Sequence, residues 1–83
     1  MRMSDEQVAR QILEIFRRYR VPPEGFLKRT HFTEVRDADF RRGMDMAMAH
    51  GWLRPHERDR YRYILTGTGQ DAFATIAPDR AMA

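Results

Sequence analysis

The chain has 83 residues and no cysteine, so side-chain packing alone must hold its fold together. It can form neither a disulfide nor a zinc site with thiolate ligands. Hydrophobic residues make up 42% of the sequence, which is enough for one core and too little for two domains. We therefore expect a single domain over residues 1–78, followed by a disordered tail at residues 79–83.

A first helix is predicted to begin after Ser4, because Ser4 and Gln7 have the spacing of a capping box. Apolar residues then recur at the helical period and predict a buried face made of Val8, Ile12, Ile15, Phe16 and Tyr19. Ala9 and Leu13 form a second apolar edge. We expect the same chain to cover this edge, with a partner chain as the alternative. A pair of prolines ends the helix near Val21.

The middle of the chain predicts a second long helix. Before it, residues 25–29 can pair as an edge strand, and residues 30–35 predict a helical turn that buries Phe32 and Val35. Residues 38–50 combine acids near the start with strong helix formers, and a glycine follows them, which is typical of a helix. The predicted core face holds Phe40, Gly43, Met44, Ala47 and Met48, and the predicted outward face holds Ala38, Arg42, Asp45, Met46 and Ala49.

The C-terminal part predicts a hairpin and a closing helix. A short strand from Trp52, a charged turn and an alternating strand over residues 61–65 form the hairpin. The alternation predicts an inward face made of Tyr61, Tyr63 and Leu65. Thr66 is predicted to cap a helix that ends before Pro78, and Gly69 is predicted to let that helix pack closely against its neighbour.

This order of elements resembles the winged helix-turn-helix domains of bacterial regulators. The resemblance is carried by the stretch MDMAMAHGWL and by the later stretch YRYILTGTGQDAF, whose Leu65-Thr66-Gly67-Thr68-Gly69 is similar to the strand-to-helix junction of those domains. It implies an α+β, mostly helical fold. That fold is a winged helix-turn-helix with a three-helix core, a two-stranded wing and a C-terminal helix.

The same resemblance implies a DNA-binding protein, a transcriptional regulator. Helix 38–50 is expected to lie in the major groove of double-stranded DNA, and the wing at residues 54–62 to contact the backbone. Arg42 is the expected base reader. The basic candidate contacts suit phosphates, and they are Lys28, Arg29, Arg36, Arg41, Arg58, Arg60 and Arg62. Asp45 and Met46, on the outward face of the helix, complete the candidate DNA-binding residues. A formal net charge of +3 also suits an anionic partner.

The outward face of helix 38–50 keeps an alternative open. Asp45 carries the wrong charge for a phosphate-lined groove, and Met46 and Ala49 suit an apolar protein contact better than DNA. The alternative is a winged-helix module for protein–protein interaction that does not bind DNA. A domain this small is also expected to work as a homodimer or beside a partner protein, through Ala9 and Leu13 or through the closing helix.

Enzyme activity is not expected, and we assign no catalytic residue, metal ligand or cofactor. Ser4 is the only serine and is used as a helix cap, and the zinc-protease pattern that begins at His56 has Arg60 where its second histidine belongs. The N-terminal residues are polar, and no segment approaches the length of a membrane span. We therefore expect a cytoplasmic location without membrane attachment.

Overall fold

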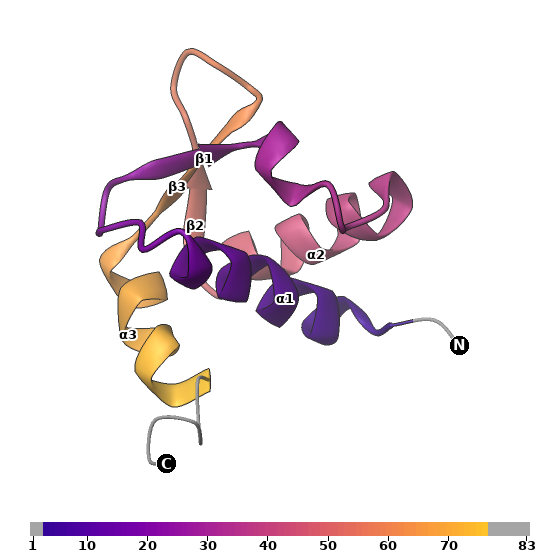
Figure 1. Ribbon diagram of the computed structural model, residues 1–83, viewed down its shortest axis with the longest axis horizontal. Coiled ribbons are helices and arrows are strands. Elements are labelled where there is room, and N and C mark those ends of the chain that lie inside the picture. The colour runs from indigo at the N-terminus through magenta and orange to yellow at the C-terminus, as the bar shows by residue number, and fades with distance from the viewer. Residues whose placement is uncertain (1–2, 77–83) are drawn as a thin grey trace.

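The computed structural model describes residues 3–76, and the side chains of residues 3–72. It is an α+β fold, as predicted (Figure 1). Along the chain lie α1 (Asp5–Arg18), β1 (Phe26–Lys28), a 3-10 helix η1 (Arg29–Phe32), α2 (Asp37–Ala49), β2 (Leu53–Pro55), β3 (Arg62–Leu65) and α3 (Gly67–Ile76). None of these helices is long and apolar enough to cross a membrane. The tail expected at residues 79–83 lies outside the described residues.

Helix α1 begins at the predicted capping box. The Gln7 amide donates to the Ser4 hydroxyl at 3.1 Å, and the Ser4 amide donates to the Gln7 side chain at 2.8 Å. Ala9 and Leu13 are fully buried within the chain, as expected, which leaves no room for the alternative of a partner chain on this edge. The prediction of a buried Tyr19 is also wrong: this residue caps the end of α1, where the helical period stops, and remains 54% exposed.

Three antiparallel strands form one sheet in the order β1-β3-β2. The predicted hairpin is β2–β3, and the possible edge strand is β1, which joins it to make three strands instead of two. The register pairs Leu27 with Tyr63 and Leu53 with Leu65, so these side chains share the inner face. Tyr61 was predicted on that face, but β3 starts one residue later and Tyr61 is 60% exposed.

Phe32 lies at the centre of the core. Its ring centroid is 5.6 Å from that of Phe16 on α1, 5.4 Å from Phe40 on α2 and 6.4 Å from Tyr63 on β3. The turn η1 therefore supplies the side chain that joins both helices to the sheet. Val35 is buried nearby, as predicted.

Two glycines are required by close approach. A Cβ atom at Gly43 of α2 would overlap the Val8 side chain of α1, and one at Gly69 of α3 would overlap the backbone oxygen of Trp52. The Gly69 amide also donates to the Thr66 hydroxyl at 3.0 Å, which confirms the predicted cap. Close packing of α2 and of α3 thus depends on having no side chain at Gly43 and Gly69.

We predict that Gly43→Ala lowers the free energy of unfolding. The overpacking penalty, about 1–3 kcal/mol, should exceed the gain in helix propensity, roughly 1 kcal/mol. The measurement is urea unfolding followed by circular dichroism. Gly67→Ala is the matched control, because no atom lies within 4 Å of a Cβ atom there, and this variant should unfold at an unchanged or higher urea concentration. Equal stability of the two variants would contradict the tight α1–α2 contact.

Candidate functional site

An open groove of about 870 Å³ separates α2 from the hairpin β2–β3. We call the connection between the two strands, residues 56–61, the hairpin loop. It projects from the end of the sheet opposite to α3 (Figure 1). The groove is lined on the α2 side by Asp37, Phe40, Arg41, Met44, Asp45 and Met48, and on the other side by Arg29, Pro55, His56, Glu57, Arg58, Arg60, Tyr61 and Tyr63.

The solvent-facing stripe of α2 is rotated about the helix axis relative to the predicted one. Its exposed residues are Asp37, Ala38, Arg41, Asp45 and Ala49. Arg42 was predicted on this stripe but is turned toward α1, where its guanidinium group pairs with Asp5. Met46 was also predicted to be outward, but it is half-buried and packs against the core. Arg41 is therefore the cation that α2 presents to the groove.

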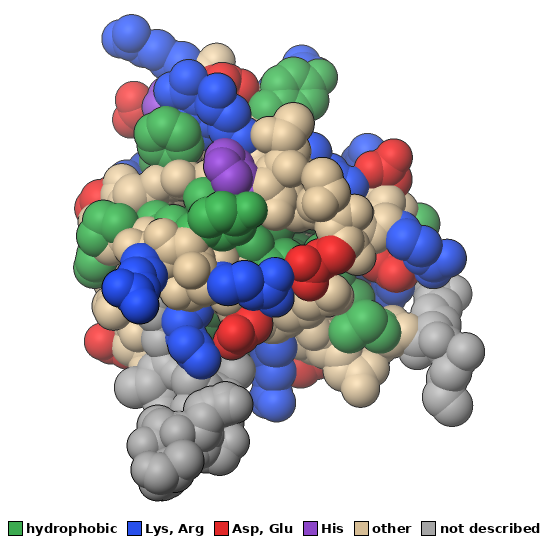
Figure 2. Space-filling view, in the orientation of Figure 1, with side chains coloured by type: hydrophobic (Ala, Val, Ile, Leu, Met, Phe, Trp, Pro, Cys, Tyr) green, Lys and Arg blue, Asp and Glu red, His purple; other side chains and the backbone are tan. Residues whose placement is uncertain are grey.

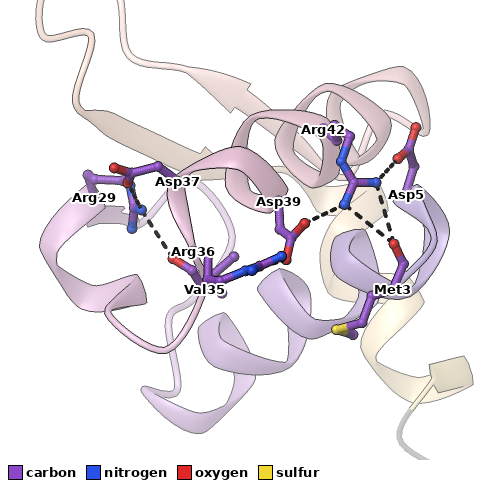
Figure 3. A network of polar contacts seen from close by, with 8 residues as sticks. All are labelled: Met3, Asp5, Arg29, Val35, Arg36, Asp37, Asp39 and Arg42. Atoms are coloured by element: carbon purple, nitrogen blue, oxygen red, sulfur yellow. Dashed lines mark hydrogen bonds and ion pairs between the residues drawn. The ribbon is translucent and has the colours of Figure 1, made fainter. Parts of the chain in front are cut away.

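Arg42 is held by an ionic network on the far side of α2 (Figure 3). Its guanidinium group donates to the carboxylates of Asp5 and Asp39 and to the Met3 carbonyl, and its side chain is only 23% exposed. The hydrogen bond from Arg42 holds the pKa of the Asp39 carboxyl below its ordinary value. Arg36 joins the network, with its Nε atom 3.3 Å from an Asp39 oxygen. The network fastens the start of α2 to the start of α1.

Arg29 fixes the same end of α2 from the groove side. It donates to the carbonyl oxygens of Phe32 at 3.0 Å and Val35 at 3.1 Å, and to the Asp37 carboxylate at 2.6 Å. Its guanidinium carbon also lies 4.0 Å from the centre of the Phe40 ring. Because α2 has no side-chain N-cap, these contacts hold its first turn in place. Arg29 borders the groove, but both of its terminal guanidinium nitrogens already donate within the chain.

Two side chains hold the hairpin loop in its conformation, and this role was predicted for neither of them from the sequence. The His56 ring nitrogen accepts from the backbone amides of Arg58 and Asp59, each at 3.1 Å, and Asp59 accepts from the Tyr61 amide at 2.9 Å. The sequence signal for this loop is a histidine at its start and an aspartate within it, because both side chains can accept hydrogen bonds from nearby backbone amides. This folding presents Arg58 and Arg60 at the groove.

The remaining predicted cations divide between the groove and the outer sheet face. Arg58 and Arg60 are exposed and form no ion pair with the described residues. Arg62 instead pairs with Asp59 at 3.1 Å and lies over the ring of Phe26. Lys28 stands opposite Arg62 in the register and lines no part of the groove. Figure 2 shows basic and acidic side chains mixed at the end of the molecule where the hairpin loop projects.

The floor of the groove is aromatic and its rim carries both charges. Burial raises the pKa of the half-buried Tyr63 phenol, which stays neutral at physiological pH. Three arginines on the rim have no acidic partner in the described chain: Arg41, Arg58 and Arg60. Two acids on the rim, Asp45 and Glu57, have no basic partner there. The groove can therefore receive a ligand with negative charges at its edge and hydrogen-bond donors near α2.

We predict that Asp39→Asn reduces the loss of stability in acid. The folded-state pKa of Asp39 lies below its ordinary value of 3.8, so its ion pair stabilises the fold above that value and is lost as the pH falls through the lowered pKa. Urea unfolding should show the variant less stable than the parent at neutral pH, with the difference shrinking between about pH 5 and pH 1.

Part of the acid sensitivity should remain in Asp39→Asn. The pKa values of Glu6 and Glu34 are also lowered, by hydrogen bonds with His50 and Arg18 respectively. Asp71→Asn, on the exposed side of α3, is the control and should follow the parent at every pH. A constant difference between Asp39→Asn and the parent down to the lowest pH would contradict a charged role for the network.

Within residues 3–76, no group of three histidine or acidic side chains is placed to hold a metal ion. No protein-family model matches the chain, and neither the curated proteins nor the solved structures include a significant match. The function therefore has to be argued from the residues of the groove.

Proposed function

We propose that the chain is a winged helix-turn-helix protein that binds double-stranded DNA and regulates transcription. In this proposal α2 enters the major groove and the hairpin loop follows the sugar–phosphate backbone. The supporting arrangement is a helix with an exposed stripe beside a projecting hairpin, with an open groove between them. A protein that places a helix in the major groove and a loop on the adjacent backbone needs the helix and the loop side by side with a gap between them.

The observation that carries the proposal is that most arginines are paired with acidic side chains and that most of the unpaired ones lie at the groove. Eight arginines of the described chain have an acidic partner: Arg10, Arg17, Arg18, Arg29, Arg36, Arg42, Arg54 and Arg62. Arg20, Arg41, Arg58 and Arg60 have none there, and three of these four, Arg41, Arg58 and Arg60, line the groove. A guanidinium group without an internal partner keeps its planar donors for phosphate oxygens or for a guanine edge.

The three unpaired arginines of the groove have different roles, which follow from the elements that carry them. Arg58 and Arg60 lie on the loop and contact phosphates, which positions the protein without reading sequence. Arg41 lies on the exposed stripe of α2 and takes the base-reading role that the sequence assigned to Arg42. Arg29, Arg36 and Arg42 support the site indirectly, because their ion pairs hold the start of α2.

A second candidate function is a protein–protein interaction module. The observation in its favour is Tyr61, which is 60% exposed at the groove between charges of both signs. Tyrosine is enriched at the centre of protein interfaces, and the rim around that centre is polar. In this case Tyr61, and not the half-buried Met46, would be the central contact.

We predict that Arg58→Ala/Arg60→Ala weakens DNA binding evenly across sequences. Each phosphate contact contributes about −0.9 to the slope of log affinity against log salt concentration, so the double variant should lose roughly 2 units of slope. The measurement is fluorescence anisotropy with a mixed pool of duplex DNA at several salt concentrations.

Arg20→Ala is the matched control for charge. Arg20 is exposed, has no ion pair within the described residues and lies outside the groove, so its removal should leave the salt slope unchanged. Equal effects of removing Arg20 and of removing the loop arginines would contradict the assignment of the groove. Failure of the parent protein to bind duplex DNA at low salt would reject the DNA proposal and favour the protein-binding candidate.

A further inference from the structure

We infer that Asp45 reads a cytosine base and thereby determines part of the DNA sequence that the protein selects. This inference rests on the proposed function. Asp45 is exposed at the middle of the α2 stripe, lines the groove and forms no ion pair with the described residues. A carboxylate in this position needs a partner that donates hydrogen bonds, because phosphates on either side of it would repel it.

The major-groove edge of DNA offers such a donor. Cytosine presents its N4 amino group there, and Asp or Glu side chains accept from it. Adenine also presents an amino group, but its N7 acceptor lies beside that group and would repel a carboxylate. Guanine presents only acceptors at the same edge, and would leave a buried carboxylate unpaired. The chemistry of Asp45 therefore favours a base pair that turns a cytosine amino group toward α2.

The neighbours of Asp45 on the stripe allow a close approach to the bases. Ala49 follows Asp45 by one helical turn and Ala38 precedes it by two turns on the same stripe, and their small side chains allow α2 to lie deep in the major groove of DNA. A short side chain such as aspartate reaches a base edge only when the helix lies this deep. The stripe thus combines one short acceptor with small flanking residues.

Arg41 sets the position of a second base. It precedes Asp45 by four residues, so the two side chains leave α2 on the same side, separated by roughly 6 Å along the helix axis. Bases on one strand are about 3.4 Å apart. With Arg41 on the O6 and N7 atoms of guanine, the two contacts fall about two base pairs apart. The selected site is expected to contain this guanine and cytosine as its strongest positions.

The test compares the full-length protein with Asp45→Asn by selection from a randomised duplex pool. The parent should enrich a site with a strong cytosine position. Replacing that cytosine in a single duplex should weaken parent binding by roughly 5- to 150-fold. Asp45→Asn should lose this preference and move toward adenine, whose N6 and N7 atoms match an amide side chain. The other positions of the site should keep their preferences.

Asp71→Asn controls for the change in net charge. Asp71 is exposed on α3 and lies outside the groove, so this variant should select the same site as the parent. If Asp45→Asn binds every sequence more tightly by one common factor and selects the parent site, Asp45 is only a repulsive charge and the inference fails while DNA binding stands. If the parent shows no DNA binding at all, the inference and the proposed function fail together. Circular dichroism of each variant establishes that it is folded.

Discussion

The contact of Phe32 with three other rings is the interaction on which the rest of this structure depends. The short helix η1 contributes this one side chain, and through it α1, α2 and the sheet meet in a single core. Each such aromatic pair adds roughly 0.5–1.5 kcal/mol beyond the burial of its area. A chain of 83 residues without disulfides has few other means of joining a helical layer to a small sheet. The groove depends on the same cluster, since Phe40 and Tyr63 belong to both.

Ion pairing then divides the arginines between support and function. The start of α2 lacks a side-chain cap and is held from two sides, by Arg29 with Asp37 and by Arg42 with Asp5 and Asp39. These contacts neutralise several arginines with acidic partners, and they hold the start of α2 in place beside the groove. Arg41, Arg58 and Arg60 at the groove have no acidic partner in the described chain, so three of its four unpaired arginines lie together there.

Local signals in the sequence predicted the elements well and the individual side chains less well. The capping box at Ser4, the helical period of α1, the hairpin and the cap at Thr66 are all confirmed, because each depends on residues within a few positions of one another. The predicted sites of Tyr19 and Tyr61 fail at element ends, where the period no longer holds. The prediction that Arg42 lies on the outward face of α2 fails for another reason. Arg42 is 37 positions from Asp5 in sequence, and no local pattern shows that α1 brings an acid to it.

The sequence by itself determined the number and kind of the helices, the presence of a hairpin and the need for a glycine at position 69. Periodicity, capping and turn chemistry act over one or two turns of chain and can be read directly. Only the tertiary structure decided which arginines are neutralised, that β1 joins the hairpin as a third strand, and that Arg41 and Asp45 face the groove. These outcomes depend on contacts between distant segments, whose geometry is set by how the elements pack around Phe32 and not by the residues that flank each charge.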